Sequence, residues 1–252
     1  MAAPAIGTPT LIGVGVGPGD PTLVTLKAVA VFEAADVILV PATEASGREA
    51  GRAEQLVVAV CPTAATKLQR VPFSMAQRSG IGTKRRQSWM ASAKAAEQAF
   101  ADGAATVAFA TVGDPSVYST FSYLAAYVRD AVPGLTVSVV PGITAMQALA
   151  AVSLTPLVEG TESLTLVPVT AGMEAVATAL DTSDTVVAYK GGRQFRELLM
   201  LIRDHGRDGI LGVDVGLPSQ RLIPLAEAEN EQVPYFATVI VAPVRTETGG
   251  RL

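Results

Sequence analysis

Short apolar runs alternate along this chain with longer stretches in which apolar residues recur at helical spacing. The runs predict strands that begin near Leu11, Val37, Lys67, Thr106, Thr136, Ser163, Thr185, Ile210, Arg221 and Phe236. The stretches between them predict helices over residues 88–101, 119–130, 173–180 and 194–205. Because strands that alternate with helices usually pair in parallel beneath a helical layer, the pattern predicts an α/β fold with largely parallel sheets.

The helical pattern stops near residues 153–157, SLTPL, and a new series of strands follows. A chain of 252 residues is long enough for two small domains. We therefore predict two α/β domains, residues 1–154 and residues 155–252.

Composition argues against several functional classes. The net charge of −4, with 17% charged residues, lacks the basic excess that a nucleic-acid-binding surface needs. The single cysteine, Cys61, cannot form an internal disulfide, fits a reducing compartment, and is expected in the core. With one histidine, His205, and no Cys/His cluster, a dedicated metal site is not expected.

Two uncharged stretches could be mistaken for membrane segments. Residues 1–19 lack the cationic start of a signal peptide and are broken by prolines and glycines. Residues 131–158 are interrupted by prolines and glycines in the same way, which prevents a continuous spanning helix. We expect a soluble cytoplasmic protein with no membrane partner.

Residues 111–120, TVGDPSVYST, form the most informative motif. Gly113 allows close approach of a ligand to the main chain, and Pro115 fixes its own φ. Asp114 is left at the carboxyl end of a strand, where open α/β sheets bind their ligands. A carboxylate there suits ribose hydroxyls or a cation better than a phosphate, although a simple strand-ending turn is the alternative.

Residues 11–21, LIGVGVGPGDP, look like a dinucleotide-binding glycine loop but do not fit its pattern. Pro18 or Asp20 stands where the third glycine belongs, and the acidic residue expected after the second strand is missing, since Asp36 precedes that strand. The segment therefore predicts a tight strand-to-helix loop, with Thr22 as the helix N-cap.

Two later segments also end strands with glycine. Residues 137–146, VSVVPGITAM, predict a buried strand followed by a helix that Thr144 caps. Residues 185–193, TVVAYKGGR, predict a strand that closes in glycines. In order and spacing, GxGPGDP, GDPxxY, VPGIT and the Tyr-x-Gly strand end resemble the tetrapyrrole (precorrin/uroporphyrinogen) methyltransferase family over roughly residues 10–245.

The resemblance implies S-adenosylmethionine as the cofactor, bound folded in a cleft between the two domains, and a homodimer. The family's cofactor-binding positions correspond to Pro18, Val112, Gly113, Asp114, Val117, Thr144, Ala145, Tyr189, Lys190 and Gly216. Tyr118 is expected to line the same cleft. A sulfonium donor needs apolar walls and backbone polar contacts rather than a phosphate cradle, and these residues fit that requirement.

Some family members carry a Tyr-Asp-Arg sequence after the second strand, where this chain has Val40-Pro41-Ala42. This difference argues against methylation of uroporphyrinogen. The Val40-Pro41 start and the segments VPFSM (71–75) and GDPSVYSTF (113–121) instead resemble the precorrin-2 C-20 methyltransferase subgroup. No catalytic residue is assigned, because the C-20 carbon of such a substrate is already enamine-like.

A tetrapyrrole substrate carries many carboxylates, which arginine side chains bind well. The candidate substrate-binding residues are Arg48, Arg52, Lys84, Arg85, Arg86 and Arg193. A solvated helix start is the alternative for the Lys84–Arg86 run. Trp89 is expected to anchor the core, with a dimer contact as its alternative.

Other functions remain open at this point, the first being that of another precorrin or uroporphyrinogen methylase. The same scaffold serves RNA ribose methylases and diphthine synthases, although the acidic balance argues against RNA. A catalytically idle module that binds S-adenosylmethionine is a further alternative. The sequence carries no ligand pattern that distinguishes a metal-free from a cobalt-loaded substrate.

Overall fold

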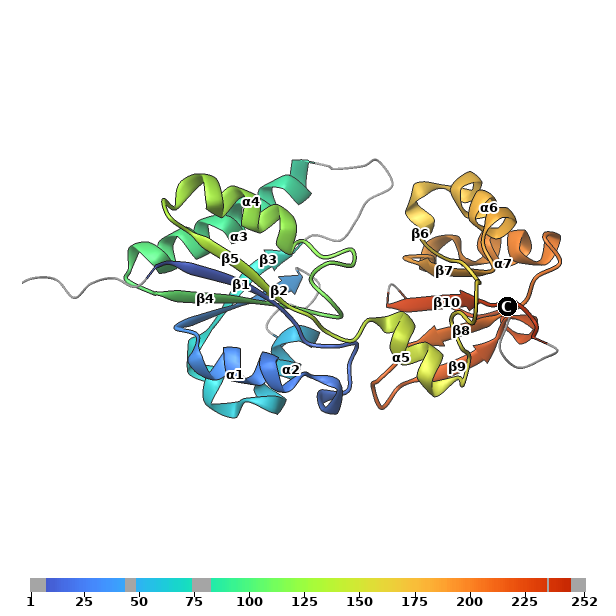
Figure 1. Ribbon diagram of the computed structural model, residues 1–252, viewed down its shortest axis with the longest axis horizontal. Helices are drawn as coiled ribbons and strands as arrows, with labels where there is room; N and C mark the ends of the chain where they lie inside the picture. The colour runs from blue at the N-terminus through green and yellow to red at the C-terminus, as the bar shows by residue number, and fades with distance from the viewer. Residues whose placement is uncertain (1–7, 44–48, 74–82, 235, 246–252) are drawn as a thin grey trace, which may run out of the picture. The chain divides into compact units, whose positions relative to one another are not determined.

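The computed structural model describes residues 8–43, 49–73, 83–234 and 236–245 (Figure 1). The chain divides into two compact units, Met1–Thr144 and Ala145–Leu252. This division assigns the helix after the fifth strand to the second unit, whereas the sequence pattern placed that helix in the first domain. No helix in the described ranges is both long and apolar enough to cross a membrane.

The first unit is built on a five-stranded sheet in the order β3-β2-β4-β1-β5, with every pairing parallel. The strands are β1 (Thr10–Gly15), β2 (Val37–Thr43), β3 (Leu68–Phe73), β4 (Thr106–Thr111) and β5 (Thr136–Val140). The helices are α1 (Leu26–Ala34), α2 (Arg52–Val60), α3 (Thr83–Ala101) and α4 (Phe121–Ala131), with 3-10 turns at Pro21–Leu23 (η1) and Pro62–Lys67 (η3).

Helices cover both faces of this sheet, as Figure 1 shows. On one face, Phe32 of α1 and Val57 of α2 pack with Val14 and other apolar residues of the strands. On the other face, α3 and α4 pack over Leu11 and Phe109. Because successive side chains of a strand point to opposite faces, a sheet buried on both sides needs the nearly continuous apolar runs seen in the sequence.

The second unit contains a mixed sheet in the order β6-β7-β10-β8-β9. Its strands are β6 (Leu164–Pro168), β7 (Thr185–Tyr189), β8 (Ile210–Val213), β9 (Arg221–Pro224) and β10 (Ala237–Val241). β6 and β7 are parallel, and β10 is antiparallel to both β7 and β8, so β6, β7 and β8 run in one direction. β9 returns antiparallel to β8.

Helices also cover both faces of the second sheet. The helices are α5 (Ala145–Val152), α6 (Met173–Thr182) and α7 (Phe195–Asp204), with 3-10 turns at Val169–Ala171 (η4), Gly192–Gln194 (η5) and Leu225–Glu227 (η6). α6 and α7 pack Val176 and Leu198 against one face. Leu149 of α5 packs against Gly212 on the other face. A Cβ on Gly212 would lie only 2.6 Å from the Leu149 side chain.

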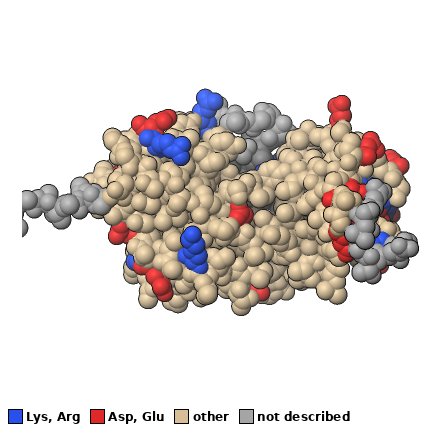
Figure 2. Space-filling model, in the orientation of Figure 1, with Lys and Arg blue, Asp and Glu red and all other residues tan. Residues whose placement is uncertain are grey.

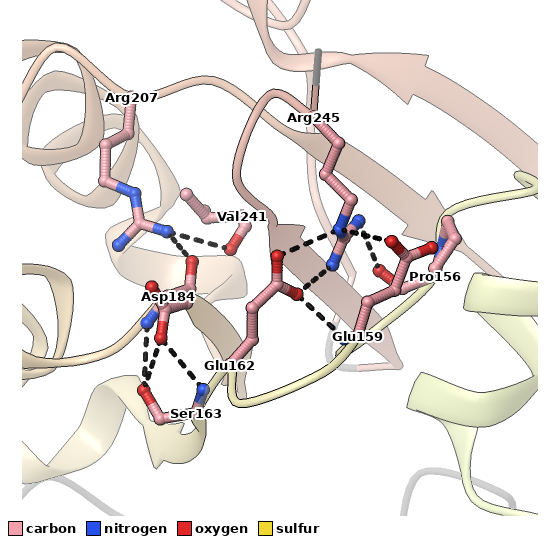
Figure 3. A network of polar contacts seen from close by, with 8 residues as sticks. All are labelled: Pro156, Glu159, Glu162, Ser163, Asp184, Arg207, Val241 and Arg245. Atoms are coloured by element: carbon pink, nitrogen blue, oxygen red, sulfur yellow. Dashed lines mark hydrogen bonds and ion pairs between the residues drawn. The ribbon is translucent and has the colours of Figure 1, made fainter. Parts of the chain in front are cut away.

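Two half-buried arginines, Arg207 and Arg245, tie the strand ends of the second unit together (Figure 3). Arg207 donates to the backbone carbonyls of Asp184 and Val241, and the Asp184 carboxylate accepts from the Ser163 N–H at 2.9 Å. Arg245 pairs with Glu162 at 2.5 Å and donates to the Pro156 carbonyl at 3.1 Å. These contacts link β10 to β7 and to the segment that precedes β6.

The predicted elements agree closely with the structure. Each strand begins within one residue of its predicted start, and the four predicted helices are present, although α3 begins at Thr83 rather than Ser88. The buried positions of Cys61 and Trp89 are confirmed, with Trp89 stacked on Tyr123 at a ring-centroid distance of 4.2 Å. α2 was not predicted.

The predicted N-cap at Thr22 is wrong. The loop first makes the turn η1, in which Asp20 accepts from the Thr22 N–H at 2.8 Å. α1 therefore begins later, and Thr25 caps it by accepting from the Ala28 N–H at 3.1 Å. Two hydroxyl residues three positions apart compete for this role, and Pro21 favours the early 3-10 turn because it pre-sets φ.

Candidate functional site

The loops that follow β1 and β4 meet at the carboxyl edge of the first sheet. The two strands are parallel neighbours, so their carboxyl ends lie side by side. Gly113 donates its N–H to the Gly17 carbonyl at 2.8 Å, and Gly17 donates to the Gly113 carbonyl at 3.3 Å. Both glycines have left-handed backbones, with φ of 75° and 74°. Only glycine adopts this conformation without strain, which explains its presence in both motifs.

The loop after β5 joins the same cluster. A Cβ on Gly15 would lie 2.6 Å from both the Gly142 nitrogen and the Gly113 oxygen. Three backbones therefore approach one another more closely than any side chain would allow. This packing explains Gly15 and Gly142 independently of any ligand, whereas the left-handed backbone explains Gly17 and Gly113.

The Asp114 carboxylate connects two of these loops. It is only 7% exposed; its Oδ1 accepts from the Ser116 N–H at 2.7 Å and from the Ser116 hydroxyl, and its Oδ2 accepts from the Gly142 N–H at 2.8 Å. Burial alone raises the pKa of Asp114, but the hydrogen bonds from Ser116 and Gly142 outweigh it and hold the pKa below its ordinary value. The group is therefore an ionised carboxylate whose two oxygens both accept from protein donors.

In the second unit, Tyr189 at the end of β7 contacts the start of α5. Its phenolic oxygen accepts from the Met146 N–H at 3.0 Å. The first N–H groups of a helix have no partner within the helix, and Tyr189 supplies one of the missing acceptors. Thr144, the residue before the helix, is buried.

Unusual backbone conformations coincide with the motifs. Among the described residues, four that are not glycine have left-handed φ values: Tyr118 (51°), Leu154 (54°), Lys190 (61°) and Asp214 (51°). Three of these four lie in or beside the motifs nominated from the sequence, and Gly216, with φ of 85°, lies two residues after Asp214. A left-handed residue other than glycine costs of order 1–2 kcal/mol, and such strain concentrates at functional sites.

The remaining nominated residues occupy the same loops. Pro18 is buried, while Val112 and Val117 are half-buried. The Val117 N–H donates to the Asp114 carbonyl at 3.2 Å and closes the turn. Tyr118 is 40% exposed, and its partial burial raises the pKa of the phenol above its ordinary value. Ala145 is the first residue of α5.

The structure thus links each motif to the next by hydrogen bonds. Gly17 joins the first motif to the second through Gly113, Asp114 joins the second to the third through Gly142, and Tyr189 of the fourth motif holds Met146 at the end of the third. Each link lies within one of the two compact units.

The charge of these loops restricts the ligands they suit. Residues 11–25, 111–120 and 140–146 contain no Lys or Arg, and the first two ranges contain Asp20 and Asp114. A phosphate needs a cationic or N–H-rich cradle, whereas a neutral nucleoside or a cation does not. The loops therefore fit a ligand that is uncharged or positive. Among the described residues, no group of three or more His, Cys, Asp or Glu side chains could hold a metal ion.

The candidate substrate-binding cations lie on separate elements. Arg52 is half-buried at the start of α2, and Arg86 and Arg193 are exposed on α3 and η5. Neither Arg86 nor Arg193 forms an ion pair with another described residue. Arg48 lies outside the described residues, as do the side chains of Lys84 and Arg85 in the first turn of α3. In the view of Figure 2 the Lys and Arg side chains form small separate groups on a largely uncharged surface.

Sequence reasoning missed the residues that hold the loops together. These are Gly15, Gly17, Ser116, Gly142 and Met146. A signal existed for Ser116, because an Asp followed two residues later by a backbone donor forms an Asx turn. The distant pairings of Gly142 and Met146 have no local signal.

Comparison with known proteins identifies the family of this chain. The family model of tetrapyrrole (corrin/porphyrin) methylases matches residues 10–229, and the chain belongs to this family. A precorrin-2 C(20)-methyltransferase from Sinorhizobium sp is 31% identical over 94% of this chain and 96% of that protein. A probable cobalt-precorrin-2 C(20)-methyltransferase from Methanocaldococcus jannaschii is 32% identical over 88% of this chain and 84% of that protein.

Solved structures share the fold. A uroporphyrin-III C-methyl transferase from Thermus thermophilus, complexed with S-adenyl homocysteine, superposes with a TM-score of 0.65 at 22% identity. The alignment covers 92% of this chain and 97% of that one. The predicted class, two α/β domains of the tetrapyrrole methylase fold, is confirmed.

Proposed function

We propose that this protein is an S-adenosylmethionine-dependent C-methyltransferase of cobalamin biosynthesis that methylates precorrin-2 at C-20 to give precorrin-3A. The observation that carries the proposal is the set of four motifs linked by Gly17–Gly113, Asp114–Gly142 and Met146–Tyr189 hydrogen bonds. Names and coverage of the Sinorhizobium and Methanocaldococcus relatives support the choice of substrate.

The loops fit S-adenosylmethionine, which supplies a methyl group on a positively charged sulfur. The loops after β1, β4 and β5 carry no cation that would repel a sulfonium, and their apolar residues and open backbone suit a nucleoside. The residues proposed to form its binding site, either by direct contact or by positioning the loops, are Pro18, Val112, Gly113, Asp114, Val117, Tyr118, Thr144, Ala145, Tyr189, Lys190 and Gly216. Both units contribute residues to this set.

The protein's own contribution to the reaction is positioning. Transfer of a methyl group to carbon is an in-line displacement, so alignment of the two reactants and exclusion of water supply most of the rate. Val40, Pro41 and Ala42 near the end of β2 provide no acid or base. This agrees with a substrate carbon that is nucleophilic before any proton is removed, and we assign no catalytic acid or base.

The substrate carboxylates are proposed to bind the cations Arg48, Arg52, Lys84, Arg85, Arg86 and Arg193. The exposed guanidinium groups of Arg86 and Arg193, which have no ion-pair partner among the described residues, support this role. An arginine binds a carboxylate through two parallel hydrogen bonds, which orients as well as attracts it.

Binding of the cofactor is the first test of this function. Calorimetry with S-adenosylmethionine should give a dissociation constant of about 1 μM, or about −8 kcal/mol. Absence of heat and of thermal stabilisation at millimolar ligand would refute the assignment. Comparing metal-free with cobalt-loaded precorrin-2 as substrate then decides which form is used, since relatives of both names exist.

Binding without methyl transfer to either form would favour the non-catalytic module. Transfer only to RNA or to a diphthine precursor would favour the other enzymes on this scaffold. The acidic balance of the chain, with a net charge of −4, makes RNA the less favoured of these substrates.

We also propose a cytoplasmic homodimer. The family resemblance and an apolar-rich composition support a symmetric assembly with a large buried face. Small-angle scattering at micromolar concentration should fit a particle twice the mass of the 25.9 kDa chain. A single-chain particle would contradict it.

A further inference from the structure

We propose that Asp114 and Tyr189 are positioning residues that hold the connection between β5 and α5, residues 141–146, from its two ends. The sequence nominated both as direct cofactor contacts. The functional part of this inference rests on the proposed cofactor, whereas its structural part does not.

The first tether is the carboxylate of Asp114. Its Oδ2 accepts a hydrogen bond from the Gly142 N–H at 2.8 Å, while its Oδ1 accepts from both the N–H and the hydroxyl of Ser116. The side chain is 7% exposed, so these bonds form away from bulk water and are strong for an ionised acceptor. The Gly142 backbone also lies against the end of β1, where a Cβ on Gly142 would come within 2.8 Å of the Gly15 Cα.

The second tether is the phenol of Tyr189. The phenolic oxygen accepts a hydrogen bond from the Met146 N–H at 3.0 Å, in the first turn of α5. Gly142 and Met146 are four positions apart in the sequence, and Thr144 and Ala145, both nominated for cofactor binding, lie between them. Two side chains far apart in the sequence thus fix the two backbone N–H groups that bracket this nominated pair.

This arrangement changes what each side chain does for a ligand. A direct contact would act independently at each residue. Tethers act through the shared connection, so loss of either one frees the same backbone and the second loss adds little. Residues coupled through a shared backbone shift show such non-additive effects.

Two substitutions separate the tether from a direct contact. Asp114→Asn keeps size and polarity but offers one oxygen and one NH₂ group, so Ser116 or Gly142 faces a donor instead of an acceptor. A ribose hydroxyl could pair with either end of the amide and would tolerate the change. Tyr189→Phe removes only the hydroxyl, and Tyr127→Phe on the exposed side of α4 is the matched control.

Amide exchange in the ligand-free protein tests the structural part. The Gly142 amide should exchange at least about tenfold faster in Asp114→Asn, and the Met146 amide likewise in Tyr189→Phe, since a hydrogen bond of about 1.5 kcal/mol is worth about tenfold. The control should match wild type. Unchanged exchange at either amide would overturn the corresponding tether.

Calorimetry with S-adenosylhomocysteine tests the functional part, at a temperature where circular dichroism shows each variant folded. Each single variant should bind about tenfold more weakly, and the double variant should bind about as weakly as either single one, not about a hundredfold more weakly. Normal affinity with a lowered melting temperature, or additive losses, would refute positioning through the connection. If wild type binds no ligand, the proposed function fails while the exchange data still decide the tethers.

Discussion

Gly15 at the end of β1 and Gly142 after β5 are in direct backbone contact. A Cβ on Gly15 would lie 2.6 Å from the Gly142 nitrogen, and a Cβ on Gly142 would lie 2.8 Å from the Gly15 Cα. The neighbouring atoms are main chain, so neither clash can be relieved by rotating a side chain. This contact brings the loops of two adjacent parallel strands together, and it makes glycine obligatory in both motifs.

Gly142→Ala should therefore destabilise the first unit by about 3 kcal/mol or more, because overpacking against a fixed backbone is costly. Chemical denaturation measures the loss. The control is Gly134→Ala, where φ is 73° but no atom lies within 4 Å of the added Cβ. That variant should lose only about 1 kcal/mol from its left-handed backbone. Equal losses in the two variants would contradict the close contact.

At Leu154, in contrast, a substitution should increase the stability of the protein. It follows α5 with φ of 54° and is 88% exposed, and the Thr155 N–H and Leu154 N–H donate to the carbonyls of Ala150 and Ala151. This is a Schellman motif in which leucine occupies the position that favours glycine. Leu154→Gly should stabilise the protein by about 0.5–1 kcal/mol, since relief of strain exceeds the added entropy of the unfolded chain.

Thermal unfolding of Leu154→Gly should show the gain. Leu26→Gly is its control, because Leu26 is 89% exposed but begins the helix α1. There glycine should cost up to about 1 kcal/mol. A loss of stability at both positions would show that the left-handed conformation of Leu154 is not strained.

The Arg245–Glu162 pair predicts a pH dependence. The hydrogen bond from Arg245, which is the larger effect, holds the pKa of Glu162 below its ordinary value, and burial partly opposes it. A lowered folded-state pKa means that the pair's stabilisation is complete above the unfolded pKa of about 4.3 and is lost as pH falls through the folded pKa.

Glu162→Gln should accordingly lower the melting temperature at neutral pH, and its difference from wild type should shrink as pH falls from about 5 to about 3. Scanning calorimetry across this range provides the measurement. In Glu231→Gln, which removes the more exposed pair with Arg221, the effect should be small at every pH. A difference that grows on acidification would reverse the assigned sign.

Arg193 tests the proposed binding of substrate carboxylates. Arg193→Ala should raise KM for the tetrapyrrole about tenfold, the equivalent of about 1.4 kcal/mol, without changing the affinity for the cofactor. Arg196 is also an exposed arginine, on α7, and gives a matched control. Steady-state kinetics with both variants distinguishes a specific contact from general attraction by positive charge. Equal effects on KM would contradict a specific role for Arg193.

The sequence predicted the strands well and the site only in part. Apolar runs bounded by glycine and proline mark strands such as β4 and β7 because burial on both faces requires them. The motifs also identified the loops, but not the hydrogen bond that Asp114 accepts from Gly142. Its partner Gly142 is separated from it by α4 and β5, and nothing in local spacing specifies that contact. The mixed pairing of the second sheet could not be predicted for the same reason. β10 inserts between β7 and β8 through long-range pairing, which local sequence does not specify.

Transfer of a methyl group to C-20 of precorrin-2 can be followed with S-adenosylmethionine that carries a ¹³C-labelled methyl group. After incubation with the protein and precorrin-2, carbon NMR of the product should show one new labelled methyl group attached at C-20, with S-adenosylhomocysteine formed in equal amount. Label at another ring carbon, or bound cofactor with no labelled tetrapyrrole from either metal-free or cobalt-loaded precorrin-2, would contradict the account.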